Sequence, residues 1–112
     1  MATVDISDKT VHQDTRDLFT TLIMLDGSEV YDAGSIADGN EETGELTITG
    51  AALGDFVLVS HSVDVADLAI TGAVTAANTV TYQLNNNTGG SVDLASGTVY
   101  ARVFKRGDVL GA

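Results

Sequence analysis

Apolar and polar side chains alternate in short segments along the second half of the chain. The clearest segment is residues 79–85, where Val80, Tyr82 and Leu84 share one face and polar residues occupy the other. Four similar segments, separated by clusters of Gly, Asn, Asp and Ser, run over residues 46–49, 56–59, 68–74 and 99–105. Turn signals about 8–12 residues apart predict successive antiparallel strands in a sandwich or barrel.

A chain of 112 residues has the length of one domain. We therefore expect a single antiparallel β-sandwich, jelly-roll-like, with an extended N-terminal arm. The unbroken apolar run over residues 56–59 predicts a central strand that is covered on both faces. The predicted core residues are Val57, Val59, Ile70, Val80, Tyr82, Leu84, Val99 and Val103.

The first 45 residues follow neither the helical nor the strand period cleanly. We interpret residues 1–45 as an acidic arm with edge strands and residues 46–112 as the sandwich body. Residues 17–25 fit a short helix or a strand; their β-branched side chains, and the Asp26-Gly27 pair that predicts a turn behind them, favour a strand. The polar, glycine-rich residues 32–44 predict an exposed loop or arm.

Charge is distributed unevenly along the chain, whose formal net charge is −11. Residues 1–67 hold nearly all of the acidic residues and two basic ones, whereas residues 68–112 are close to neutral. A surface this negative repels phosphate, so nucleic acid is not an expected partner. The acidic residues either keep the protein soluble or meet a positive protein surface.

Catalytic and metal-binding patterns are weak in this sequence. Cysteine is absent, which excludes disulfides, zinc–thiolate sites and thiol catalysis. Residues 60–64 (SHSVD) contain serine, histidine and aspartate, but neighbours on an extended segment point to alternate faces. The loop over residues 38–42 collects oxygen ligands without the EF-hand spacing, which favours a solvated acidic loop over a cation site.

These patterns predict no catalytic residue, no metal site and no cofactor, and we do not expect an enzyme. The N-terminal residues show no basic region followed by an apolar run, and no apolar stretch approaches the length of a membrane span. We therefore expect no membrane partner.

Three turn motifs follow one another in fixed order through the strand-rich half. They are G-A-x-x-G-D at residues 50–55, A-x-N-T-V-x-Y at residues 76–82 and N-x-T-G at residues 86–89. In this order they resemble a short β-sandwich domain of bacteriophage structural proteins, a group that includes capsid decoration (cement) proteins and fibre ends. The resemblance implies a compact domain for oligomerisation or docking, and it supplies no catalytic residues.

The resemblance implies a non-enzymatic viral structural protein, a decoration subunit on the outer surface of a phage head that stabilises it across capsomer boundaries. The expected location is the capsid surface of the virion. The expected partners are the major capsid protein and further copies of the chain, with a trimer ahead of a dimer. The alternatives are a fibre or tail subunit and a carbohydrate-binding β-sandwich module.

The acidic arm is the predicted docking element, because it mixes carboxylates with apolar side chains that a small sandwich would leave uncovered. The alternative is that residues 18–25 simply form another strand of the sandwich. The candidate capsid-docking residues are Asp14, Asp17, Leu18, Phe19, Leu22 and Ile23.

Overall fold

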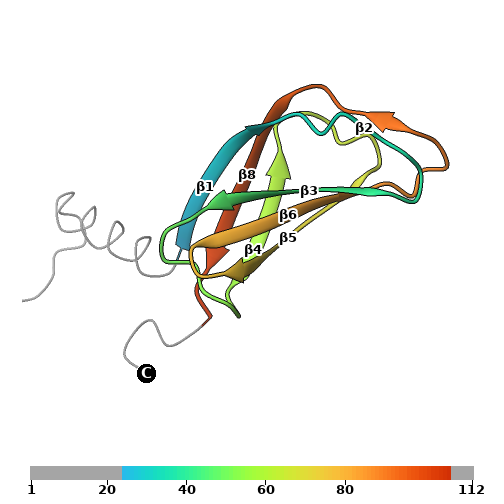
Figure 1. Cartoon of the computed structure of the whole chain (residues 1–112). Helices are drawn as coiled ribbons and strands as arrows, with labels where there is room; N and C mark the ends of the chain where they lie inside the picture. The colour runs from blue at the N-terminus through green and yellow to red at the C-terminus, as the bar shows by residue number, and fades with distance from the viewer. Residues whose placement is uncertain (1–23, 107–112) are drawn as a thin grey trace, which may run out of the picture.

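The computed structural model describes residues 24–106, which form an all-β fold without a helix (Figure 1). All strand pairs are antiparallel, which confirms the all-β, antiparallel part of the predicted fold. The strands are β1 (Met24–Tyr31), β2 (Ser35–Ile36), β3 (Glu41–Thr47), β4 (Phe56–His61), β5 (Ala69–Ala76), β6 (Thr79–Asn85), β7 (Val92–Asp93) and β8 (Gly97–Phe104).

Two three-stranded sheets face each other, and a two-stranded sheet of short strands lies at one end of the molecule (Figure 1). The strand orders are β1-β8-β4, β3-β6-β5 and β2-β7. The main core contains inward side chains from both larger sheets, chiefly from the central strands β6 and β8. A smaller cluster near β2 and β7 comprises Ile36, Leu68, Leu84 and Leu94.

The strands with strict alternation were predicted well, because a central strand with one dry face has to alternate. β6 spans the predicted residues 79–85, and Val80, Tyr82 and Leu84 are fully buried. Val99 and Val103 of β8 are also fully buried. The remaining predicted core residues, Val57, Val59 and Ile70, are partly buried and pack against the core from end strands.

The prediction that residues 56–59 form a central strand covered on both faces is wrong. β4 is an end strand with β8 as its one hydrogen-bonded neighbour in the sheet. Phe56 and Leu58 are 63% and 65% exposed, whereas the alternate residues Val57 and Val59 face the core. The apolar run therefore covers the core with one side and faces solvent with the other.

The prediction of a turn at Asp26-Gly27 is also wrong, because both residues lie in the middle of β1. They pair with Arg102 and Ala101 of β8. This pairing with a distant segment of the chain holds their backbone in an extended conformation. Residues 32–44 are likewise not one continuous loop, since β2 and the first part of β3 fall within them. The rest of the predicted arm, up to residue 23, lies outside the described residues.

Glycines allow the two sheets to approach each other where their end strands meet. A Cβ atom on Gly72 of β5 would lie 2.2 Å from Cγ2 of Val59 on β4. On the other side of the molecule, a Cβ atom on Gly27 of β1 would lie 2.6 Å from Cγ1 of Ile48. Both distances are shorter than any tolerable contact, so these positions require glycine for packing reasons.

We expect Gly72→Ala to lower the free energy of unfolding by about 1–3 kcal/mol, because the added methyl group overpacks the contact with Val59. Gly90→Ala is the matched control, since no atom lies within 4 Å of its added Cβ. Urea denaturation of both variants measures the difference. Equal stability of the two variants would contradict the packing argument.

Candidate interaction surface

Asp55 ties the turn before β4 to the end of β8. Its Oδ2 accepts hydrogen bonds from Lys105 Nζ at 2.6 Å and from the Ala52 backbone N–H at 3.0 Å. Its Oδ1 accepts the Arg106 backbone N–H at 3.0 Å, and Lys105 also donates to the Gly50 carbonyl. The Asp55 side chain is 5% exposed. These hydrogen bonds account for the presence of aspartate at the last position of the first turn motif.

Asn78 holds the second turn motif against the first. It has a φ of +62°, a left-handed conformation that asparagine tolerates better than most residues. Its Oδ1 accepts the Gly50 N–H at 2.8 Å, and its own backbone N–H donates to the Ala51 carbonyl at 2.8 Å. The first two motifs therefore stabilise each other.

Asn86 is the buried anchor of the third motif, with 1% of its surface exposed. Its Nδ2 donates to the carbonyls of Ile36 and Gly90, at 2.7 and 2.8 Å. Its Oδ1 accepts both the backbone N–H and the hydroxyl of Thr88. All three motifs thus fix turns of the fold, and their polar groups are engaged in that role.

Tyr82 connects the two larger sheets by a side-chain hydrogen bond. Its ring crosses Gly44 of β3, and its hydroxyl donates to the carboxylate of Glu29 on β1. Tyr31 packs edge-on against it, with ring centroids 5.1 Å apart. Burial, reinforced by the hydrogen bond to Glu29, raises the pKa of Tyr82, so the phenol stays protonated and serves as a structural donor.

The outer face of the β1-β8-β4 sheet exposes several large apolar side chains to solvent. We define this outer face as the even-numbered residues of β1, β4 and β8, which alternate with the inward ones. Val30, Phe56, Leu58 and Tyr100 are between 48% and 76% exposed. Patches of this kind mark interaction sites in soluble proteins.

The strand register places the outer-face residues in rows across the sheet. One row holds Phe56 opposite Phe104, and the next holds Leu58 opposite Arg102. Arg102 also forms a two-pronged ion pair with Asp26, with Nε–Oδ1 and Nη2–Oδ2 distances of 2.6 and 3.1 Å. The ion pair lies on the surface and neutralises the charge of this row.

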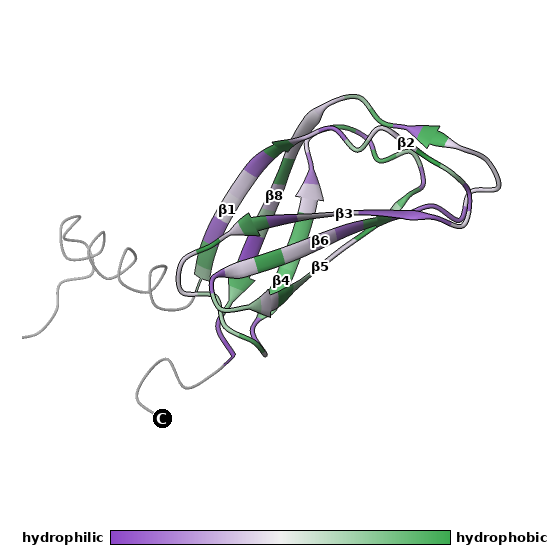
Figure 2. Cartoon of the chain, viewed as in Figure 1, coloured by the Kyte–Doolittle hydropathy of each residue, from purple (hydrophilic) through white to green (hydrophobic). Residues whose placement is uncertain are grey.

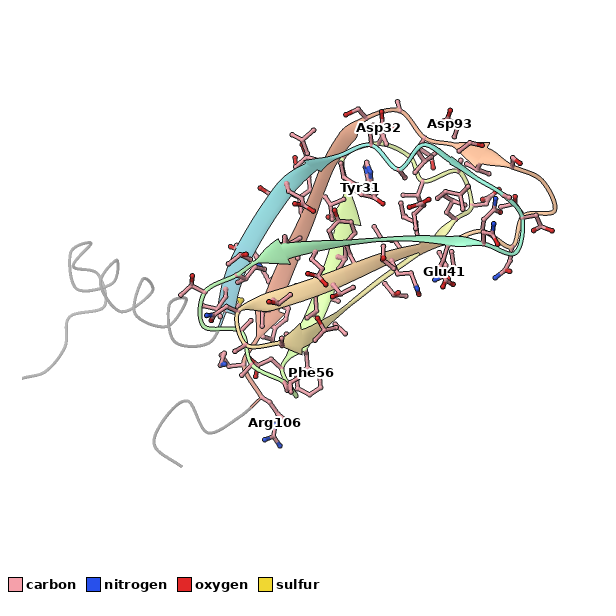
Figure 3. The ribbon with its side chains drawn as sticks, viewed as in Figure 1. Tyr31, Asp32, Glu41, Phe56, Asp93 and Arg106 are labelled. Carbon is pink, nitrogen blue, oxygen red and sulfur yellow. The ribbon has the colours of Figure 1, made fainter. Side chains whose placement is uncertain are left out.

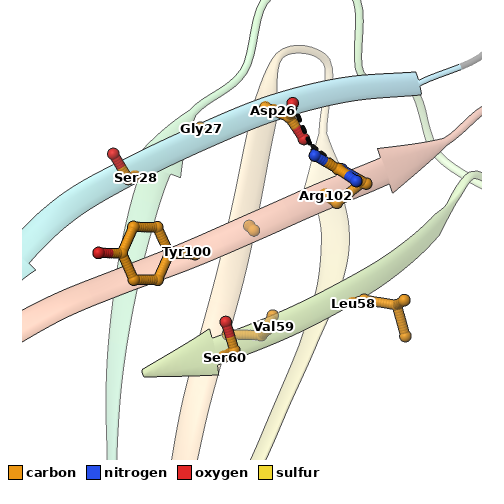
Figure 4. A pocket seen from close by; sticks show the side chains of 9 residues that line it. Asp26, Gly27, Ser28, Leu58, Val59, Ser60, Tyr100 and Arg102 are labelled. Atoms are coloured by element: carbon orange, nitrogen blue, oxygen red, sulfur yellow. Dashed lines mark hydrogen bonds and ion pairs between the residues drawn. The ribbon is translucent and has the colours of Figure 1, made fainter. Parts of the chain in front are cut away.

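The centre of the outer face is hollowed into an open depression of about 850 Å³ (Figure 4). Tyr100 lies in this depression between Ser28 of β1 and Ser60 of β4, which are its direct cross-strand neighbours. The Asp26–Arg102 pair borders the same depression. An aromatic ring is therefore flanked by hydroxyl groups and an ion pair.

The opposite outer face, on the β3-β6-β5 sheet, has a different composition. Its exposed positions on β5 and its wet positions on β6 are mainly Thr, Ala, Gln and Asn. Several of these groups hydrogen-bond to one another: Thr75 Oγ1 to Thr81 Oγ1 at 2.7 Å, and Asn85 Nδ2 to Gln83 Oε1 at 3.0 Å. This surface is polar and does not need a partner to cover it.

The few basic residues of the described part lie near one another, and two of them are paired with acidic side chains. The basic residues between positions 24 and 106 are Arg102, Lys105 and Arg106, at the end of β8. Figure 3 shows Phe56 and Arg106 at one end of the molecule and Asp32 and Asp93 at the other. The apolar row of the outer face therefore adjoins a region where the positive charges of Arg102 and Lys105 are offset by Asp26 and Asp55.

The structure does not assemble a catalytic group from residues 60–64. The His61 Nδ1 accepts the backbone N–H of Val63, and the Ser62 hydroxyl oxygen accepts the backbone N–H of Thr98. Among residues 24–106, no three His, Asp or Glu side chains gather in a way that could hold a metal ion. The Asp38 carboxylate instead accepts the Gly89 N–H at 3.0 Å.

The predicted docking residues, from Asp14 to Ile23, lie outside the described part of the chain. The outer face was not singled out from the sequence. The alternation of Tyr100, Arg102 and Phe104 with buried residues indicates the part of the outer face on β8. The part on β4 could not be recognised, because a continuous apolar run does not show which side of the strand is exposed.

Comparison with known proteins adds no family assignment: no family model matches the chain, and no curated protein matches it. Within the described range no helix has the length and apolar character needed to cross a membrane.

We expect Asp55→Asn to lower the free energy of unfolding by about 1–3 kcal/mol at neutral pH, because a nearly buried charge-assisted anchor is lost. Burial by itself would raise the pKa of Asp55, but hydrogen bonds from Lys105 and two backbone N–H groups outweigh it and lower the pKa below its ordinary value. Because the pKa of Asp55 is lower in the folded state than in the unfolded state, its ionised form stabilises the fold at every pH above the unfolded-state pKa. This stabilisation is lost as the pH falls through the folded-state pKa.

The difference between wild type and Asp55→Asn should therefore be complete at pH 7 and shrink in acid. Urea denaturation across this pH range measures it. Asp93→Asn, which changes an exposed carboxylate, should show no comparable effect. A difference that grows in acid would be inconsistent with this role of Asp55.

Proposed function

We propose that this protein is a non-enzymatic structural subunit of a bacteriophage particle, a decoration or cement protein that binds the outer surface of the head. Its partners are then the major capsid protein and further copies of itself, and its location is the surface of the virion. The order of the three turn motifs supports the phage assignment, because it is the pattern that resembles domains of phage structural proteins.

The observation that carries a binding role is the uncovered outer face of the β1-β8-β4 sheet. Phe56, Leu58 and Tyr100 form its apolar part, and the Asp26–Arg102 pair supplies polar groups beside them. Exposed aromatic and apolar side chains with an arginine among them are typical of protein–protein contacts. The polar face of the opposite sheet offers no comparable contact.

A decoration protein of this kind acts by mass action. A subunit that binds only the assembled shell, across the boundary between capsomers, stabilises the assembled state in proportion to its affinity and concentration. Several copies joined together bind more tightly than one, because the second contact becomes intramolecular. Neither effect needs a reacting group.

We further propose a β-sandwich of jelly-roll type. The pairs β1–β8, β2–β7 and β3–β6 are nested, as in a long hairpin folded over on itself, and this order supports the assignment. β4 and β5 depart from the nesting, since they pair with β8 and β6 instead of with each other.

The acidic arm belongs to the same proposal. β1 begins at Met24, which is paired with Phe104 at the apolar end of the outer face. The predicted docking residues therefore precede, in the sequence, a strand of this face. The predicted docking residues Asp14 to Ile23 and the outer face would then contact the capsid together.

Binding of labelled protein to purified phage heads, with electron microscopy to locate it, tests this proposal. We expect the double substitution Phe56→Ser, Leu58→Ser to weaken binding at least tenfold, because it removes two exposed apolar contacts. Thr71→Ser on the polar face is the matched control and should bind as the wild type does. A chain without residues 1–16 tests the contribution of the arm.

Normal binding by the double variant would contradict the role of the outer face. Label on the tail or fibres instead of the head would favour the alternative of a fibre or tail subunit.

One observation favours a second candidate, a carbohydrate-binding module. Sugars stack on exposed aromatic rings and hydrogen-bond to nearby polar groups, and Tyr100 lies between Ser28 and Ser60 in the depression. If this candidate is correct, a glycan array will show binding that Tyr100→Ala abolishes and Tyr31→Phe retains. An array without any binding would leave the protein-docking role as the better account.

A further inference from the structure

The four end strands of the two larger sheets differ in charge. β1 carries Asp26 and Glu29, and β3 carries three glutamates, whereas β4 and β5 carry no Asp, Glu, Lys or Arg. The charged strands β1 and β3 border one side of the molecule, and the uncharged strands β4 and β5 border the other. Figure 2 shows the contrast between hydrophobic β4 and hydrophilic β3.

Charged side chains on an end strand prevent it from pairing with another chain. β1 and β3 have this protection, and β4 does not. Its sequence FVLVSH contains no proline, glycine or acidic residue, and it has the β-branched and aromatic residues that strands favour. An end strand of this kind is a template for a further strand.

The β4 side of the molecule also leaves apolar groups uncovered. Phe56 and Leu58 are exposed on the outer face, and Val57 and Val59 are only partly buried although they point inward. The inward residues of the central strand β8, in contrast, are at most 4% exposed at Val99, Ala101 and Val103. Val57 and Val59 therefore keep some exposed surface at this end of the sheet, although Val59 packs against Gly72 of β5.

We propose that β4 pairs antiparallel with β4 of a second copy of this chain. The pairing joins two β1-β8-β4 sheets into one six-stranded sheet and merges their outer faces into one surface. It does not depend on the capsid as a partner. Where the proposed function holds, the merged surface would double the docking contacts.

Charge favours a second copy at this side. Residues 24–106 contain eleven acidic and three basic residues, so two copies repel each other when acidic surfaces meet. The uncharged β4 side allows close approach with little of this repulsion. Antiparallel pairing of a strand with its own copy is also closed by a two-fold axis, so the assembly stops at two chains.

The absence of cysteine from the chain makes a thiol cross-linking test specific. In the proposed pair, the β4 strands lie one strand spacing apart, about 4.8 Å, and the two β1 strands lie five spacings apart, about 24 Å. Leu58→Cys should therefore give a two-chain product with a short thiol–thiol cross-linker. Val30→Cys on β1, which is 76% exposed, is the matched control and should give none.

The cross-linking uses the full chain without capsids, so its outcome is separate from that of the proposed function. Light scattering of the wild type should give the mass of two chains, and Leu58→Lys should give one chain of about 11.6 kDa with an unchanged strand spectrum. A single-chain wild type, a three-chain mass, or equal cross-linking of the two cysteine variants would each overturn the β4 pairing.

Discussion

The close approach of end strands is the constraint on which the rest of this structure depends. The core is built from Val, Leu, Ile, Ala and few aromatic residues, so it is thin, and the two larger sheets have to meet closely to exclude water. They meet where an inward position has no side chain. Gly72 accommodates Val59, and Gly27 accommodates Ile48. Within the β3-β6-β5 sheet, Gly44 leaves room for the ring of its cross-strand neighbour Tyr82. The Tyr82 hydroxyl then reaches Glu29 and ties the two sheets together.

The position of each strand in its sheet explains which parts of the fold could be predicted from the sequence. β6 and β8 are central strands, so each alternates between core and surface, and both were recognisable from a single sequence. β1 was concealed because Asp26 and Gly27, which lie in its middle, resemble a turn when read locally. Their extended conformation comes from pairing with residues about 75 positions later in the chain. A pattern of neighbouring residues does not show which distant segment a strand pairs with.

The candidate surface was harder to predict than the fold, for a related reason. Whether a continuous apolar strand is covered on one face or both depends on the strand order, and β4 lies at the end of its sheet. The motifs that do stand out in the sequence serve the fold: Asp55, Asn78 and Asn86 each hold a turn by accepting backbone N–H groups. The three turn motifs are therefore distinct from the residues that would contact a partner.

This separation of roles bears on the kind of binding the molecule can perform. The polar groups of the turns, and two side-chain pairs of the β3-β6-β5 face, are hydrogen-bonded within the chain. The outer face of β1-β8-β4 is close to neutral, because Asp26 and Arg102 offset each other, although the body as a whole is strongly acidic. Contacts through this face would draw mainly on apolar burial, which salt screens little, while the acidic remainder of the surface disfavours indiscriminate association. In the proposed role, a neutral, apolar face on an acidic body would combine affinity at one surface with repulsion at the others.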